Sequence, residues 1–281
     1  MMSYKTILVQ CDAGRAAPAR LEWAATLAER HQAHLIGLHA RPPFEPVVAD
    51  GGTFAMDLLF KDHEEALAES ESVSAKAFAA AVKGKALSSE WRSSSGYADA
   101  LLTVHARYAD LTVVGQHDPE ASSGLTPPPD LPETVALGTG RAVVVVPFVG
   151  VPTSLGRKIM LCWNASREAA RAATDAMPLL QAAEAVTVLI VDPASSEAGH
   201  GSEPGADVAT WLSRHGVKVT VQRDAAADAD AGNVILSRAM DHGCDLIVMG
   251  IYGHSRLREL VLGGVSRTML VRMTMPVLMA H

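Results

Sequence analysis

The segment Asp110-Leu-Thr-Val-Val-Gly115 returns 135 residues later as Asp245-Leu-Ile-Val-Met-Gly250. Each copy is a short apolar run that ends in glycine, which is typical of a buried strand in a parallel sheet. An alanine-bearing helical pattern precedes each copy, at 98–109 and at 233–243. The two copies therefore predict an internal repeat, in which a helix leads into a buried strand in each half of the chain.

The repeat extends toward both ends of each half. Further matching segments are the first strands at 6–12 and 158–164, the amphipathic helices at 17–31 and 168–183, the second strands at 33–39 and 185–191, and the closing strands at 142–147 and 276–281. Apolar strands that alternate with helices predict a parallel sheet that is covered on both faces. We therefore expect an α/β protein made of two tandem doubly wound, Rossmann-like domains.

A linker separates the two halves. The segment 147–156 holds two prolines and two glycines, a composition that ends a strand and cannot continue a helix. We place the first domain at 1–149 and the second at 154–281. The offset between the halves is 152 residues at the first strand and 135 at the fourth, so the first half is longer in between. We expect this extra length chiefly as a surface loop at 41–51.

Composition excludes several classes of protein. Of the 281 residues, 48% are apolar and 20% charged, and the formal net charge of −7 argues against nucleic acid or a membrane surface as a partner. Apolar runs are only strand-sized, no secretory signal is visible, and three separated cysteines form no CxxC. His31 and His34 have metal-like spacing without an acidic third ligand nearby, so we expect an ordinary surface pair and no metal. These features predict a soluble cytoplasmic protein.

A glycine-rich segment marks the candidate site in the second half. Ligands of open α/β sheets bind beyond the carboxyl ends of the strands, and here the residues after the first and fourth strands are Asn164 and Gly250. More glycines follow Gly250, and then a helical run over 265–273. The N–H groups that open such a helix form an anion site, which the hydroxyl of Ser266 assists. The segment therefore predicts a phosphate cradle.

This segment resembles the nucleotide motif of the universal stress protein family, G-x2-G-x9-G followed by Ser or Thr. Gly250, Gly253 and Gly263 satisfy the spacing, and the Val-Ser pair at 265–266 follows as in the family. Gly264 stands where the family's ATP binders have Ser or Thr. The resemblance covers nearly the whole chain, with one universal stress domain in each half.

The resemblance implies that ATP or AMP, with Mg²⁺ as a companion ion, binds in the second half. It places the base near Asn164 and Ile190 and the phosphates at the glycines. The implied binding residues are Asn164, Ile190, Met249, Gly250, Gly253, Gly263, Gly264, Val265 and Ser266. The family generally has Asp where this chain has Asn164, so hydrogen bonding is kept while a negative charge is lost. The hydroxyl missing at Gly264 removes one hydrogen bond, worth about 0.5 to 1.5 kcal/mol.

The first half departs further from the motif. Asp12 matches the family's Asp, but Asp118 replaces the second glycine and a proline run at 127–129 replaces the third. Prolines lack the N–H groups that a phosphate needs, and Asp118 and Asp130 add charge that repels it. We expect this half to bind no nucleotide and to act structurally, with a different small ligand left open.

Enzyme signatures such as GxxxxGK[ST], GxSxG and HExxH are absent from the sequence. We therefore expect a regulatory protein of the stress response and no enzyme, with weak ATP hydrolysis left open. The alternative is a nucleotide-free structural or protein-interaction member of the same family. The resemblance also implies antiparallel pairing of the closing strands in an intramolecular pseudo-dimer, and it favours a homodimer of two chains.

Overall fold

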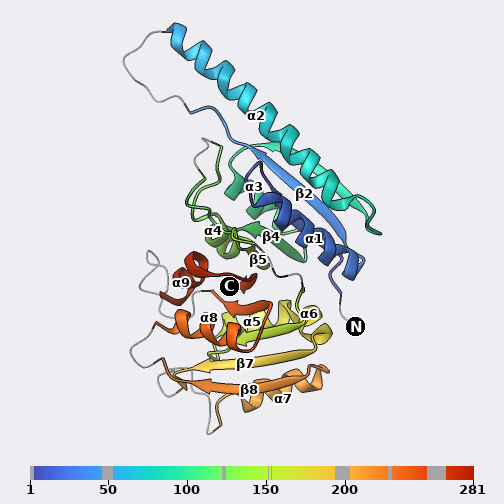
Figure 1. Cartoon of the computed structure of the whole chain (residues 1–281), viewed down its shortest axis with the longest axis vertical. Coiled ribbons are helices and arrows are strands. Elements are labelled where there is room, and N and C mark those ends of the chain that lie inside the picture. The colour runs from blue at the N-terminus through green and yellow to red at the C-terminus, as the bar shows by residue number, and fades with distance from the viewer. Residues whose placement is uncertain are drawn as a thin grey trace.

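The computed structural model describes residues 3–45, 53–121, 125–150, 152, 154–193, 203–226, 230–251 and 264–281. Over these ranges strands and helices alternate along the chain, and the two halves lie one above the other (Figure 1). Helices cover both faces of the strands, which is the architecture expected of two doubly wound α/β domains.

The first half runs from β1 to β5. Its elements are β1 (Thr6–Cys11), α1 (Ala17–His31), β2 (His34–Arg41), α2 (Thr53–Val82), β3 (Ser89–Ser95), α3 (Ala98–Ala106), β4 (Leu111–Gly115), α4 (Leu131–Gly138) and β5 (Ala142–Val146). The helix predicted at 17–31 is confirmed as α1. A proline lies in its first turn, and Gln32 ends it in the left-handed conformation with a φ of 52°.

The second half runs from β6 to β10. Its elements are β6 (Lys158–Cys162), α5 (Arg167–Asp175), α6 (Met177–Ala182), β7 (Ala185–Val191), α7 (Ala206–Arg214), β8 (Val219–Asp224), α8 (Ala231–Asp241), β9 (Leu246–Gly250), α9 (Gly264–Arg272) and β10 (Val277–Ala280). The single helix predicted at 168–183 is two helices separated at Ala176. Pro178 in the first turn of α6 has no N–H to continue the ladder of α5.

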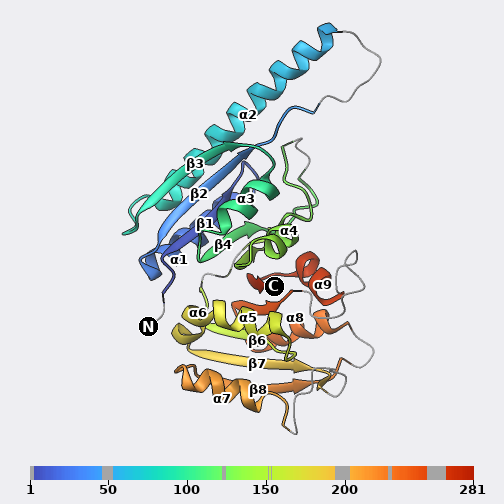
Figure 2. The ribbon, with the colours of Figure 1, turned by 180° about the vertical axis from the view of Figure 1, so that it is seen from behind.

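Helix α2 holds most of the extra length of the first half. It has 30 residues, whereas its counterpart α7 has 9. The prediction of a surface loop as the chief insertion was therefore wrong: residues 42–45 are irregular, 46–52 lie outside the described residues, and a long helix follows. Figures 1 and 2 show α2 lying across one face of the first half and projecting past the end of the sheet.

The ten strands form one sheet, in the order β3-β2-β1-β4-β5-β10-β9-β6-β7-β8. Strands within each half are parallel, while β5 and β10 pair antiparallel, with Val145 opposite Val277 and Val143 opposite Met279. Strand order reverses between β1 and β4 in the first half and between β6 and β9 in the second. These two switch points are where an open α/β sheet presents its ligand sites.

Two apolar cores cover the two faces of the sheet, and each extends through both halves. One core includes Leu21 of α1 and Leu179 of α6, and the other includes Leu102 of α3 and Met269 of α9. Both halves are thus held on a common apolar framework, which fixes the carboxyl ends of the strands relative to one another. Among the described residues, no helix has the length and apolar character needed to cross a membrane.

Candidate functional site

In the second half, the turn after β6 holds Asn164 at the edge of the sheet. The Asn164 side-chain oxygen accepts a hydrogen bond from the Ser166 N–H at 3.2 Å. The Ser166 hydroxyl oxygen in turn accepts from the Ala169 N–H at 3.1 Å and caps α5. Asn164 therefore keeps its amide nitrogen for other partners, and the side chain is only half-buried.

Gly250, which ends β9, lies against the first turn of α5. A Cβ at this position would lie 2.6 Å from both the Ala169 nitrogen and the Glu168 carbonyl carbon. Backbone atoms cannot give way as a side chain can, so this position requires glycine for packing as well as for any ligand. The strand therefore ends close to Asn164, since β6 and β9 are neighbours in the sheet.

Helix α9 begins at Gly264 and presents its N-terminus at the same end of the sheet. Gly264 is exposed, Val265 is half-buried and Ser266 is buried. Among the described residues, the nearest atom to a Cβ on Gly264 would be an Asp230 carboxylate oxygen at 3.8 Å. Gly253 and Gly263, the two other motif glycines, lie outside the described residues.

Two carboxylates flank this end of the second half. Asp230 precedes α8 and lies beside Gly264, while the buried Glu168 is paired with the exposed Arg167. Burial alone would raise the pKa of Glu168, but hydrogen bonding and the charge of Arg167 outweigh it and hold the pKa below its usual value. The N-terminus of α9 therefore faces a negative charge at Asp230, which a bare phosphate would encounter.

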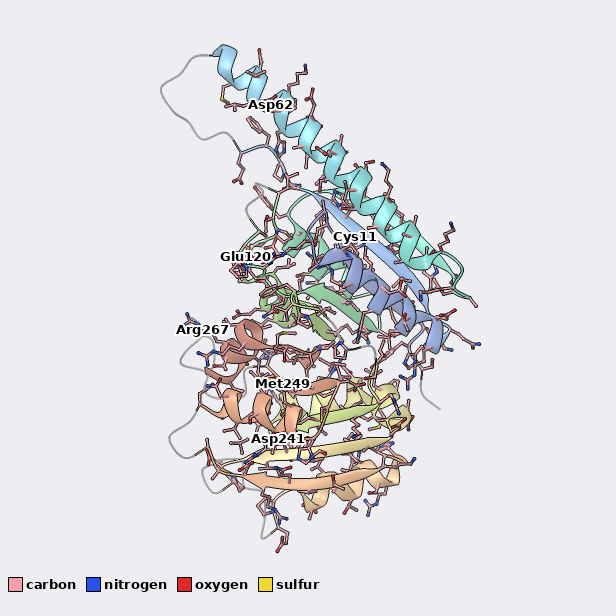
Figure 3. The ribbon with its side chains drawn as sticks, in the orientation of Figure 1. Cys11, Asp62, Glu120, Asp241, Met249 and Arg267 are labelled. Atoms are coloured by element: carbon pink, nitrogen blue, oxygen red, sulfur yellow. The ribbon has the colours of Figure 1, made fainter. Side chains whose placement is uncertain are left out.

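Ile190 and Met249, the two remaining predicted residues, belong to opposite faces of the sheet. Ile190 is fully buried in the core that contains α5 and α7. Met249, which is labelled in Figure 3, is buried in the core that contains α8 and α9. The structure thus places Asn164, Gly250 and the start of α9 at the same end of the sheet, but it places Ile190 and Met249 in separate cores.

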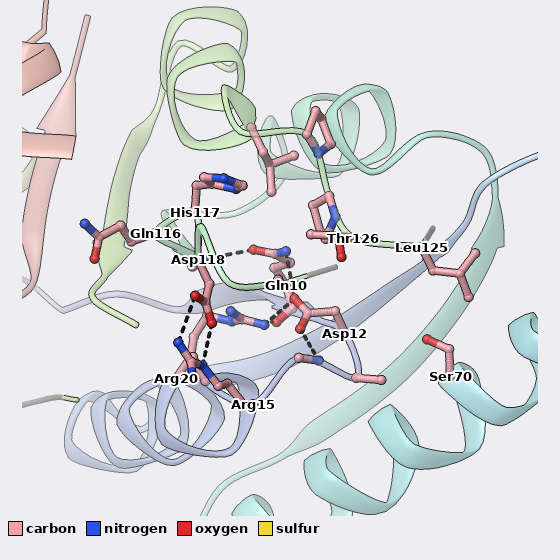
Figure 4. A pocket seen from close by; sticks show the side chains of 18 of the residues that line it. Gln10, Asp12, Arg15, Arg20, Ser70, Gln116, His117, Asp118, Leu125 and Thr126 are labelled. Carbon is pink, nitrogen blue, oxygen red and sulfur yellow. Dashed lines mark hydrogen bonds and ion pairs between the residues drawn. The ribbon is translucent and has the colours of Figure 1, made fainter. Parts of the chain in front are cut away.

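A cavity of about 820 Å³ lies at the switch point of the first half. Its walls are the carboxyl ends of β1 and β4, the inner face of α2 and the proline-rich segment before α4. Charged, polar and apolar side chains line it, among them Asp12, Arg15, Arg20, Glu69, Ser70, Asp118, Glu120, Leu125, Pro127 and Pro128. Figure 4 shows Asp12 after β1, Asp118 after β4 and Ser70 on α2 around this space, with the Asp118 carboxylate directed toward Arg15.

A hydrogen-bond network closes the floor of the cavity. Arg20, which is 4% exposed, pairs with Asp12 at 2.5 Å, and its Nε donates to the Gln10 carbonyl oxygen at 3.1 Å. The Gln10 side chain donates to Asp12 and accepts from the Gly115 N–H. The Asp that matches the family motif is therefore already held by a guanidinium group of its own chain.

A second ion cluster forms the rim. Arg15 donates to both oxygens of Asp118, at 2.6 and 2.9 Å, and pairs with Glu120 at 2.7 Å (Figure 4). The Arg15 guanidinium holds the pKa of Asp118 below its usual value. Asp118 was identified from the sequence, but Arg15, Arg20 and the α2 residues were not. The internal repeat matches Asp12 with Asn164 and Gly115 with Gly250. This match indicates a switch point in the first half as well, and it could have directed attention to the residues around it.

The described residues hold no group of three or more His, Cys, Asp or Glu side chains that could bind a metal ion. The structure has two switch points at which a small molecule could bind. The one between β1 and β4 opens into a cavity, and the one between β6 and β9 lies beside the N-terminus of α9. The protein is therefore a tandem doubly wound α/β protein. Each half has the strand-order reversal at which open α/β sheets bind ligands.

The comparisons with known proteins identify the family. The model of the universal stress protein family matches the chain twice, at residues 3–126 and at 156–281. The chain therefore belongs to the universal stress protein family and carries two of its domains in tandem. No curated protein sequence matches the chain.

Solved structures share the fold at low identity. A universal stress protein from Archaeoglobus fulgidus DSM 4304 matches 98% of this chain and 95% of its own length, at 16% identity and a TM-score of 0.69. A universal stress protein candidate from Pseudomonas aeruginosa matches 99% of this chain and 93% of its own length, at 13% identity and a TM-score of 0.57. A universal stress protein in complex with cAMP matches 52% of this chain and 99% of its own, at 22% identity and a TM-score of 0.34.

Proposed function

We propose that this universal stress protein binds an adenine nucleotide, ATP or AMP, at the switch point of its second half. The observation that carries the proposal is the meeting of three features at one sheet end: the turn at Asn164, the end of β9 at Gly250 and the N-terminus of α9. A helix N-terminus offers free N–H groups and a favourable dipole to a phosphate. Membership of the family supports the same reading.

The residues present fit a nucleotide that carries a divalent cation better than a bare one. The Asp230 carboxylate lies beside Gly264 at the start of α9, where it can face a bound phosphate. Mg²⁺ takes oxygen ligands, typically one or two carboxylates together with substrate phosphates. When bound, the ion would supply positive charge between the phosphates and Asp230. Asn164 would supply hydrogen bonds to the base or ribose, since its amide nitrogen is not used in the turn.

The output of the site is binding and regulation in the stress response, and we propose no enzymatic step. The pairing of β5 with β10 supports the two halves acting as an intramolecular pseudo-dimer, because it satisfies one edge of each half-sheet within a single chain. Association of two chains into a homodimer is a further proposal, which light scattering on the purified protein tests directly.

A second candidate is a nucleotide-free structural or interaction protein. The Asp230 carboxylate beside Gly264 favours it, as do the missing hydroxyl at Gly264 and the amide in place of a carboxylate at Asn164. All three features weaken the interactions that the second half can make with a nucleotide.

Isothermal titration with ATP and AMP, with and without Mg²⁺, separates the two candidates. Two variants at the exposed Gly264 test whether the start of α9 holds the phosphates. Gly264→Ser adds the hydroxyl that the family's ATP binders have, and Gly264→Asp adds a negative charge. We expect Gly264→Ser to tighten binding about three- to tenfold, as one added hydrogen bond predicts, and Gly264→Asp to abolish the binding of nucleotide without Mg²⁺. Folded protein that binds no nucleotide at millimolar concentration, even with Gly264→Ser, would leave the second candidate standing.

A further inference from the structure

We propose that the cavity of the first half binds a small organic cation, namely an ammonium or guanidinium group joined to an apolar body. The site is separate from the proposed nucleotide site, since it lies at the switch point between β1 and β4 and is lined by residues of the first half. Its volume of about 820 Å³ is in the range of pockets that hold small-molecule ligands.

The charges on the cavity wall select against an anion. Four carboxylates line it, from Asp12, Glu69, Asp118 and Glu120, against the two guanidinium groups of Arg15 and Arg20, so the wall carries a net charge of −2 with its histidines neutral. No lysine is among the lining residues that the structure describes. A phosphate or carboxylate ligand would therefore meet a repulsive field, whereas a cation would be attracted.

Both arginines are already engaged by carboxylates of the same cavity. Arg20 is buried and paired with Asp12, and Arg15 is paired with Asp118 and Glu120. Glu69 of α2, in contrast, has no ion-pair or hydrogen-bond partner among the described residues, and it lines the opposite wall. The excess negative charge thus faces the cavity from the α2 side, where an incoming cation can reach it.

The rest of the wall is apolar or lacks donors. Leu125 and Val73 supply apolar surface, and the prolines at 127, 128 and 132 have no N–H to offer a phosphate. Such a wall suits the methylenes or ring of an amphipathic ligand. The carboxylates are dispersed around it, and the described residues contain no three-ligand metal group, so the cavity suits an organic cation better than a metal ion.

The test compares two ligands of nearly the same shape that differ in charge, benzylamine and benzyl alcohol, with ATP as the anionic probe. Affinities are measured by ligand-detected NMR titration of the full chain at low salt, where charge effects are least screened. We expect benzylamine to bind at least fivefold tighter than benzyl alcohol, and ATP to leave benzylamine binding unchanged. Equal affinity of the two ring compounds, or displacement of benzylamine by ATP, overturns the proposal.

Three variants locate the binding. Glu69→Gln should weaken benzylamine binding about two- to fivefold, and Arg15→Gln should strengthen it by a similar factor, because it frees Asp118 and Glu120. Glu65→Gln, on the same helix but away from the cavity lining, changes the net charge equally and should have no effect. Equal losses in Glu65→Gln and Glu69→Gln would show that the ligand binds the acidic surface in general.

A steric variant gives an independent answer. Ser70 is half-buried on α2 and points into the cavity (Figure 4), so Ser70→Trp should fill it and reduce benzylamine binding at least tenfold. Circular dichroism checks that the helix is intact. Should this variant not fold, the opposite effects of Glu69→Gln and Arg15→Gln, both at exposed side chains, decide the matter. Unchanged binding in folded Ser70→Trp overturns the proposal.

Discussion

The Arg20 guanidinium occupies the space that a side chain on Gly115 would need, since its Nη1 lies 2.1 Å from the position of a Cβ there. The matching glycine of the second half, Gly250, is approached instead by the backbone of α5. The two copies of the repeated strand thus end in glycine for the same steric reason. What fills the space differs: a buried cation in the first half, and a helix terminus in the second.

Gly250→Ala should destabilise the protein. The added methyl group would lie 2.6 Å from backbone atoms of Glu168 and Ala169, and overpacking of this kind costs about 1 to 3 kcal/mol. Gly264→Ala is the matched control, because Gly264 is exposed and its nearest neighbour within the described ranges would be 3.8 Å from the added methyl group. Urea unfolding should show a loss for Gly250→Ala and little change for Gly264→Ala. Equal effects would contradict the packing role of Gly250.

Arg20→Met should lower the free energy of unfolding by about 3 kcal/mol, because it removes a buried partner of Asp12 and the donor to the Gln10 carbonyl. A double-mutant cycle with Asp12→Asn isolates the pair. We expect the double variant to lose clearly less than the sum of the two single losses. Strictly additive losses would mean that the pair contributes nothing beyond its separate residues.

The inner strands of this fold could be predicted, because their apolar runs are local signals. The two edge strands, β3 and β8, were not predicted, because they are polar and only partly buried. The repeated apolar run at 110–115 and 245–250 is enough to place β4 and β9, and the alternation around it predicts the parallel sheet. The length of α2 was not predicted. The internal repeat guided the interpretation, and the second half has no helix of comparable length at that place.

The first-half cavity depends on contacts that no local pattern encodes. Ser70 and Glu69 reach it from α2, while Asp118 and Leu125 reach it from the segment after β4. Neither segment contains a sequence motif that predicts its contact with the other. The same limit applies to His31, which was expected at the surface: Ser3 and Tyr4 cover it, with the Tyr4 ring 4.9 Å away, and it is only 9% exposed.

The buried His31 predicts a loss of stability in acid. Burial, assisted by the neighbouring Arg30, lowers the pKa of His31 from 6.5 to about 4, and its Nε2 has no hydrogen-bond partner among the described residues. Unfolded protein takes up the proton first as pH falls below 6.5. The stability that neutral His31 confers is therefore present above pH 6.5 and is lost as pH falls toward 4, by about 2 to 3 kcal/mol.

Urea unfolding at several pH values measures this effect. His31→Phe keeps an aromatic ring beside Tyr4 without a titrating group, and its free energy of unfolding should fall less between pH 7 and pH 4 than that of the unmodified protein. His34→Phe, at a half-buried position whose ring contacts Ser88, is the control. An equal fall in the unmodified protein and in His31→Phe would contradict the assignment.

Gln116 links the two halves through its side chain. Its Nε2 donates to the Leu270 and Val271 carbonyl oxygens of α9, at 2.9 and 3.1 Å, and its Oε1 accepts from the Phe148 N–H. Gln116→Leu removes these three part-buried hydrogen bonds and should cost about 0.5 to 1.5 kcal/mol for each bond that water does not replace. Gln181→Leu, which breaks a single contact within the second half, should cost less. Equal costs in urea unfolding would argue against a special role for Gln116.

We expect Asp230 to determine how the proposed nucleotide binding depends on Mg²⁺. Its carboxylate lies beside Gly264 at the start of α9, so it repels a bare phosphate and favours one that carries a divalent cation. Asp230→Asn should tighten ATP binding about two- to fivefold without Mg²⁺ and reduce the gain that Mg²⁺ provides. Asp207→Asn, an exposed carboxylate on α7, changes the net charge equally and is the control for calorimetric titration. If both variants bind ATP as the unmodified protein does, with and without Mg²⁺, the phosphates do not lie at the start of α9, and the proposed position of the nucleotide is wrong.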